Sequence, residues 1–227
     1  MLRRRPYERE CRTNSSSCCL RGRGTRLESG HHGDSWLDLE LLLLHPKRVQ
    51  PFAAEIAARL ASYDIEAVCG PLVEGAFVAL LVTSALGVPF SYAAPCADAR
   101  TDVLHRATYG IPSALRASVC GKRVAIVDDM INAGSAVRGT YADLKACGAE
   151  PVAIATLLVL GQSAAHFAAD HALSLETLSS LPNTLWTPSE CPLRASNIPL
   201  TQGLGPDDDP ALTATPRRAA LRRTTCP

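Results

Sequence analysis

The chain has 227 residues, of which 47% are hydrophobic, and its 23 basic side chains balance 22 acidic ones to a net charge of +1. A chain of this length and composition can bury the core of one α/β domain and still leave tails. The balanced charge gives no support to a protein that binds nucleic acid or a membrane surface. The longest apolar runs, around residues 76–86 and 152–160, are too short to cross a bilayer.

No two of the nine cysteines form a CxxC pair, which disfavours a zinc site and a disulfide framework. We therefore expect reduced thiols in a cytoplasmic protein. Residues 1–26 carry eight arginines and two glutamates without hydrophobic periodicity. No apolar segment follows Arg3, Arg4 and Arg5, as a secretory signal would require. These residues are predicted to form a disordered basic arm.

Residues 27–38 are rich in turn-forming residues and are predicted to enter a short strand. His31 and His32 have no other metal-ligand residues at a useful spacing, so we interpret them as ordinary loop histidines. Residues 46–62 then show a helical pattern that begins with Pro46. The apolar face of this helix is predicted to consist of Val49, Phe52, Ile56 and Leu60.

A strand, a Gly-Pro loop and the start of a helix are predicted over residues 65–75. Gly70 and Gly75 would allow the backbone to approach a ligand closely. Gly-Pro and Glu-Gly are also common in plain turns, and this stretch alone supports both interpretations equally.

Further strands are predicted at residues 87–93 and 151–160, and a helix at residues 164–172. Residues 94–108 have little apolar pattern and are predicted to form a mobile surface loop, after which residues 116–124 lead back to the sheet. Apolar strands that alternate with helices indicate a central parallel sheet with helices on both faces. Ligands of such sheets bind at the carboxyl ends of the strands.

These patterns divide the chain into three parts: a disordered arm of residues 1–26, one α/β domain of residues 27–200 and a disordered tail of residues 201–227. The tail follows from the prolines after Leu181 and the acidic run at residues 207–209.

The most informative stretch begins with four apolar residues, Val124–Val127, which predict a buried strand. Two carboxylates follow directly, then a turn with Ala133 and Gly134, and then a helix from Ser135 to Gly148. The apolar face of this helix is predicted to contain Val137, Tyr141 and Leu144. The backbone N–H groups and dipole at a helix start favour a phosphate. Carboxylates beside a phosphate suit sugar hydroxyls or Mg²⁺.

Two other interpretations compete with this phosphosugar site. An Asp pair after an apolar strand also opens phospho-acceptor receiver domains, where a third aspartate ends a strand roughly half a domain later. Here more than a hundred residues precede Asp128 and Asp129, and Asp170 is predicted to end a helix. The pair could also simply cap a helix. Strand, turn and helix all agree with the phosphosugar site, which we therefore favour.

Residues 126–135, Ile-Val-Asp-Asp-Met-Ile-Asn-Ala-Gly-Ser, resemble the phosphoribosyl-pyrophosphate (PRPP) signature of type I phosphoribosyltransferases, and most closely that of the orotate branch. The resemblance extends from about Leu27 to about Leu160. It implies a Rossmann-like fold and the transfer of ribose 5-phosphate from PRPP to a nitrogenous base, with release of pyrophosphate. It also implies Mg²⁺ carried by the substrate, with possible help from Asp128 and Asp129, and a homodimer.

The resemblance assigns roles to five groups of residues. Asp128 and Asp129 would be catalytic, and PRPP would be bound by Asp128, Asp129, Met130, Ile131, Asn132, Ala133, Gly134, Ser135 and Ala136. The pyrophosphate loop would comprise Gly70, Pro71, Leu72, Val73, Glu74 and Gly75. The base would meet Asn132 and Gln162, and the mobile loop would contribute Arg100, His105 and Arg106.

Several positions depart from the orotate enzymes. Glu74 stands where the pyrophosphate loop usually has a lysine. Residues 27–38, which we call the entry segment, have Glu28 where the orotate enzymes usually have a basic residue. Asn132 replaces the usual threonine, and Gln162 replaces the arginine that meets the carboxylate of the base. Three hypotheses follow: an orotate phosphoribosyltransferase, the same chemistry on another base, or a non-catalytic regulatory protein that binds PRPP.

Overall fold

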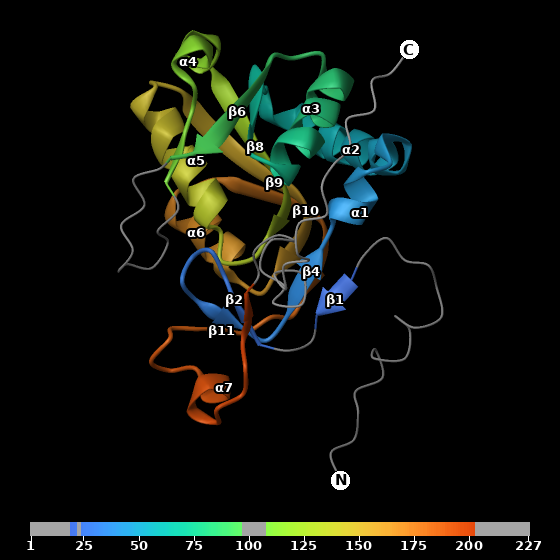
Figure 1. Cartoon of the computed structure of the whole chain (residues 1–227). Helices are drawn as coiled ribbons and strands as arrows, with labels where there is room; N and C mark the ends of the chain where they lie inside the picture. The colour runs from blue at the N-terminus through green and yellow to red at the C-terminus, as the bar shows by residue number, and fades with distance from the viewer. Residues whose placement is uncertain (1–18, 22–23, 97–107, 203–227) are drawn as a thin grey trace, which may run out of the picture.

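A computed structural model describes residues 19–21, 24–96 and 108–202. Its centre is a six-stranded sheet with the strand order β10-β9-β8-β5-β6-β7 (Figure 1). The first five strands in this order are parallel, and β7 is antiparallel to β6. The bounds are β5 Ala67–Pro71, β6 Phe90–Pro95, β7 Tyr109–Gly110, β8 Arg123–Ile131, β9 Glu150–Leu160 and β10 Ser174–Leu181.

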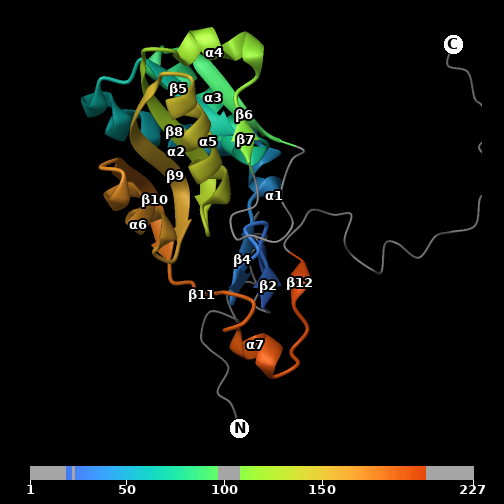
Figure 2. The same cartoon turned by 90° about the vertical axis from the view of Figure 1, so that its left-hand side faces the viewer.

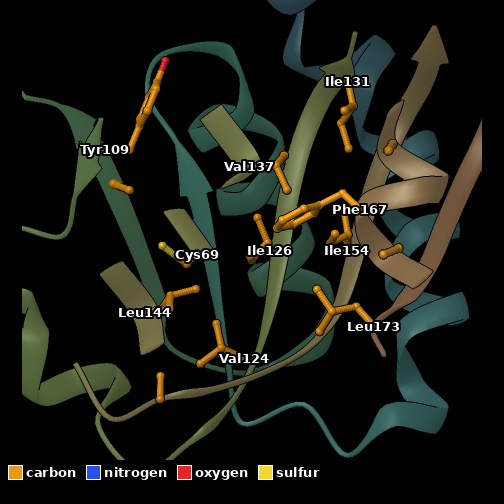
Figure 3. Close-up of a cluster of buried hydrophobic side chains, with 14 of the residues drawn as sticks. Cys69, Tyr109, Val124, Ile126, Ile131, Val137, Leu144, Ile154, Phe167 and Leu173 are labelled. Carbon is orange, nitrogen blue, oxygen red and sulfur yellow. The ribbon is translucent and has the colours of Figure 1, made fainter. Parts of the chain in front are cut away.

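Helices cover both faces of this sheet, because its inner strands are apolar on both sides. Along β8, Val124 and Ile126 join one buried cluster, whereas Ala125 and Val127 join the other. The first cluster contains Val137 and Leu144 of α5 and Phe167 of α6 (Figure 3). The second is covered by α2 and α3. The helix bounds are α1 Glu40–Leu43, α2 Pro46–Leu60, α3 Glu74–Leu86, α4 Ser113–Val119, α5 Ser135–Ala146 and α6 Ser163–Asp170.

A second, smaller sheet lies beside the central one and has the order β11-β3-β2-β12 (Figure 2). We call this sheet, together with α7, the hood. The hood elements are β2 Thr25–Arg26, β3 His32–Gly33, β11 Leu185–Trp186, α7 Pro192–Ala195 and β12 Thr201–Gln202. The chain leaves β3 through β4 (Trp36–Asp38), which pairs with β1 (Cys19–Arg21). Leu37 and Leu39 then pack on Leu158 and Leu160 near the carboxyl end of β9.

The parallel sheet with helices on both faces is confirmed. The helix predicted at residues 46–62 exists as α2, followed by a 3₁₀ turn at Ala61–Tyr63. Its predicted apolar face is wrong at Phe52, which is 44% exposed. Ala53 and Ala57 lie in the buried stripe instead, because they continue the helical spacing of Val49, Ile56 and Leu60.

Other boundaries differ from the sequence-based expectations. Strands β1 and β2 lie within the predicted N-terminal arm, and β12 lies within the predicted tail. The return segment 116–124 begins inside a short helix, α4, that the sequence pattern did not indicate. The strand β10 was also missed. Among the described residues, every helix is too short or too polar to span a bilayer.

Candidate functional site

The two signature carboxylates lie inside strand β8, which continues to Ile131. The sequence predicted that the strand would stop at Val127. Pairing with β9 extends it, because Asp128 lies opposite Thr156 and Met130 lies opposite Leu158. Asp128 is only 6% exposed, and one of its carboxylate oxygens accepts a hydrogen bond from the backbone N–H of Asp129 at 3.0 Å.

The turn after β8 leads into α5 through Gly134, whose φ of +82° is a conformation that only glycine adopts readily. Ser163 fixes this turn from α6, because its hydroxyl donates to the carbonyl oxygen of Ala133 at 2.8 Å. A pocket of about 180 Å³ opens here and is lined by eight of the nine predicted PRPP residues, Asp129 being the exception. The lining is completed by Leu27, Glu28 and Ser29 of the entry segment.

The predicted pyrophosphate loop joins β5 to α3, and α3 begins at Glu74. A Cβ atom at Gly75 would overlap the carboxylate of Asp128, so the two predicted loops touch at this point. Gly70 serves packing, because a Cβ there would lie 2.6 Å from the Cβ of Ala79. The peptide bond between Leu72 and Val73 is cis.

Burial and the charges of neighbouring carboxylates raise the pKa values of Asp128 and Asp129. Burial raises the pKa of Asp129 to about 6, and the charge of Glu74 acts in the same direction. Burial, followed by the charge of Asp129, raises the pKa of Asp128 well above its usual range. Such hard oxygen donors suit Mg²⁺. Within the described ranges no three His, Cys, Asp or Glu side chains form a group that could hold a metal ion.

We expect Asp128→Asn to stabilise the protein at pH 8 by about 1–3 kcal/mol, since it removes a buried charge and keeps an acceptor for the Asp129 N–H. The pKa of Asp128 is raised, so the destabilisation by its charge grows as the pH rises through the folded-state pKa. The gain should therefore vanish near pH 4, where the wild-type carboxyl is protonated. Urea unfolding at both pH values measures the difference in unfolding free energy between the variant and the wild type. An equal gain at pH 4 would show that the charge of Asp128 is not its cause.

The entry segment carries one correction to the sequence analysis. His31 lies in a turn, and its Nδ1 is 3.1 Å from the hydroxyl of the buried Ser29. His32 is not a loop residue, because it belongs to β3 and is only 2% exposed. Glu28 lies 3.4 Å from the hydroxyl of Tyr109, and burial raises the pKa of its carboxyl.

The predicted base-binding residues lie in different surroundings. Asn132 lines the pocket, and its Oδ1 accepts a hydrogen bond from Asn183 at 2.8 Å. Gln162 is exposed at the start of α6 and does not line the pocket. Arg138 lies with its guanidinium 4.5 Å from the ring centre of Phe167 and lines a neighbouring hollow of about 410 Å³. Arg100, His105 and Arg106 of the predicted mobile loop lie outside the described residues.

Asn183 and Ser163 are the site residues that sequence reasoning missed. Each is a single polar residue in a turn or at a helix start, and its partner lies 51 or 30 positions away in the chain. A pattern within one sequence window carries no signal for such contacts. Asp170 ends α6, as expected, and is therefore not the strand-end aspartate of a receiver domain.

Comparison with known proteins gives a consistent result. Residues 42–180 match the family model of the phosphoribosyl transferase domain. An orotate phosphoribosyltransferase of Pelotomaculum thermopropionicum is 31% identical over 77% of this chain and 84% of its own length. That of Caldanaerobacter subterraneus is 25% identical over 78% of this chain and 85% of its own length.

Solved structures share the fold. The orotate phosphoribosyltransferase of Aeropyrum pernix matches 71% of this chain and 88% of its own with a TM-score of 0.54 at 19% identity. An adenine phosphoribosyltransferase of Giardia lamblia matches 65% of this chain and 87% of its own with a TM-score of 0.55 at 15% identity. At these identities the likeness concerns the fold alone.

Proposed function

The chain belongs to the phosphoribosyl transferase domain family, and from this premise we propose that it transfers the phosphoribosyl group of PRPP to a nucleobase, nominally orotate. The observation that supports this most directly is the pocket of about 180 Å³, which is lined by Asp128 and by residues 130–136 of the signature. The similarity to orotate phosphoribosyltransferases over most of their length supports orotate as the first base to test.

In the proposed reaction a ring nitrogen of the base forms a bond to C1 of the ribose. The bond from C1 to the pyrophosphate oxygen breaks, pyrophosphate leaves with the electron pair, and the base loses its N–H proton. The transition state resembles an oxocarbenium ion, as in glycoside transfer. The protein therefore has to position the sugar phosphate and stabilise separating charge.

Each part of the site has a task in this proposal. The backbone of residues 132–136 and the Ser135 hydroxyl would hold the 5′-phosphate at the start of α5. Asp128 and Asp129 would bind the ribose hydroxyls, and their charge would favour positive character at C1. Glu74 faces the same region, where a carboxylate repels pyrophosphate. Bound Mg²⁺ would supply charge neutralisation between these carboxylates and the phosphate oxygens.

We expect PRPP with Mg²⁺ to raise the unfolding temperature, because a ligand that binds only the folded state stabilises it by mass action. At a hundred times the dissociation constant the gain is about 2.7 kcal/mol, or roughly 5–10 °C for a chain of this size. Ribose 5-phosphate should act more weakly. Differential scanning fluorimetry measures both shifts. An unchanged unfolding midpoint in millimolar PRPP would contradict the proposal that residues 128–136 bind PRPP.

The choice of base is a separate question. Orotate carries a carboxylate, which a bidentate arginine usually neutralises. Gln162 is uncharged and exposed, and Glu28 adds negative charge at the pocket. These features favour a neutral base as the second candidate substrate. A turnover assay with PRPP and a panel of bases decides between them, and PRPP binding without any turnover would identify the protein as regulatory.

We also propose a homodimer in a cytoplasmic setting. Val73, Phe77 and Leu80 form a stripe along α3 and its preceding loop, and each is about half exposed. Because Val73 precedes Glu74, a second copy seated on the stripe would border the site. Five cysteines are free thiols, which fits a reducing compartment: Cys69, Cys96, Cys120, Cys147 and Cys191.

We expect the double variant Phe77→Asp, Leu80→Asp to be monomeric at concentrations where the wild type is dimeric, since two charges would have to be desolvated in the interface. Analytical ultracentrifugation compares the two. Ile198→Asp, at an exposed apolar residue near the hood helix α7, is the matched control. A wild type that is monomeric throughout contradicts the proposed dimer.

A further inference from the structure

Two amide side chains meet where the hood joins the central sheet. Asn132 follows β8 and lines the pocket, while Asn183 lies in the link between β10 and β11. The Nδ2 of Asn183 donates to the Oδ1 of Asn132 at 2.8 Å. The remaining amide atoms, Nδ2 of Asn132 and Oδ1 of Asn183, are buried and have no hydrogen-bond partner among the described residues.

The position of Asn183 is fixed by its backbone surroundings. Gly161, at φ +73°, packs so closely that a Cβ there would lie 2.8 Å from the carbonyl oxygen of Asn183. The N–H of Gly161 also donates to the carbonyl oxygen of Leu181 at 2.9 Å. On the other side, the N–H of Thr184 donates to the carboxylate of Asp34 at 3.1 Å. The link is thus held from both the central sheet and the hood.

This arrangement determines what the side chain of Asn132 can offer to a ligand. An amide has one acceptor oxygen and one donor NH₂ group, and it can present either of them by turning about its last bond. Asn183 occupies the oxygen, so the NH₂ group is the part of the Asn132 side chain that has no partner among the described residues. An unpaired buried donor costs about 1–3 kcal/mol, which a ligand oxygen at this place would offset.

We propose that Asn183 is a positioning residue that holds the Asn132 amide with its N–H donors toward the base, so that the site prefers a base with a carbonyl oxygen over one with an amino group. This inference rests on the proposed function and on the placement of Asn132 beside the base. A carbonyl oxygen accepts the Asn132 N–H, whereas an amino group would set donor against donor.

The substitution Asn183→Asp tests the proposal, because it keeps the shape and makes the side chain an acceptor. Its carboxylate would take the N–H of Asn132 and turn the Asn132 oxygen toward the pocket. We expect the wild type to favour uracil over cytosine by roughly tenfold in kcat/KM, the equivalent of one hydrogen bond. Asn183→Asp should reduce or invert this ratio through KM for the base. Asn197→Asp makes the same change at an exposed site and should leave the ratio unchanged.

Failure of this inference is distinguishable from failure of the proposed function. A PRPP-induced thermal shift, measured in wild type and Asn183→Asp alike, reports the phosphosugar site alone. If PRPP binds and no base turns over, the proposed catalysis fails. The preference of the site is then measured by calorimetry, as the ratio of the affinities for uracil and cytosine with PRPP present. A wild type that prefers cytosine, or a ratio that Asn183→Asp leaves unchanged, overturns the role of Asn183.

Discussion

Replacing Asp129 with asparagine should lower kcat by about 10²–10³-fold, the usual loss when a group that stabilises transition-state charge is removed, while PRPP affinity changes little. The reason lies in the charge that develops at C1 of the ribose, which a carboxylate stabilises and an amide does not. The hydrogen-bonding shape is retained by the amide. The loss should therefore appear in kcat and equally in kcat/KM.

The same residue predicts the pH dependence. The pKa of Asp129 is raised to about 6 by burial, so the charged form that we propose to act in the reaction is lost as the pH falls through 6. We expect kcat/KM, which reports the free enzyme, to rise with pH up to about 6 and then to level. In the complex, bound Mg²⁺ favours the charged form, so the acid limb of kcat should lie at lower pH.

Steady-state kinetics between pH 4.5 and 8.5 with wild type and Asp129→Asn check both statements. The acid limb near pH 6 should be absent from the variant. Asp64→Asn makes the same chemical change at an exposed helix end and should leave the profile unchanged. Loss of PRPP affinity in proportion to the loss of rate would show that Asp129 only shapes the site.

The second large effect is expected for Gly134→Val, which should abolish PRPP binding. Gly134 begins α5 at φ +82°, where a β-branched side chain is strongly disfavoured. A Cβ at this position would also point toward Ile131 and Arg138, at 3.6 and 3.9 Å. The turn would have to change its path, and the N–H groups proposed to hold the 5′-phosphate would lose their common direction. The PRPP-induced thermal shift should fall to zero.

A matched control separates this effect from general destabilisation. Gly121 has φ +72° and nothing within 4 Å of an added Cβ, and it lies between α4 and β8, away from the pocket. Gly121→Val should lose a similar amount of stability and keep the full PRPP shift. If both variants lose the shift, the loss reflects backbone strain in general, and the turn at Gly134 has no special part in binding.

The central sheet could be predicted because its signals are local. Val124, Ala125, Ile126 and Val127 are all buried, alternately on the two faces of the sheet. An apolar run between turn signals is enough to predict such a strand, and similar runs recur along the chain. The extension of β8 through its two aspartates could not be predicted, since it depends on pairing with β9. The seven-residue helix α4 is too short to show a clear helical period.

The candidate site divides in the same way. The residues from Asp128 to Ala136 are contiguous, so their sequence carries the motif, and the structure places nearly all of them around one pocket. The hood is built from two-residue strands, and no periodicity can indicate strands of that length. Two of its pairings, β11 with β3 and β12 with β2, also join segments that are far apart in the chain. The contribution of Asn183 depends on that hood and was therefore invisible in the sequence.

The hood also has a consequence for the order in which the protein is made. Strands β2 and β3 leave the ribosome among the first described residues, but their partners β12 and β11 lie near residues 201 and 185. The parallel sheet, by contrast, is complete once β10 has emerged. The nascent chain can therefore fold the turn at Gly134, which we propose to bind the phosphate, while β2 and β3 still lack their partners β12 and β11. We expect competence to bind a base to be acquired after the turn at Gly134 has folded, once β11 and β12 have emerged.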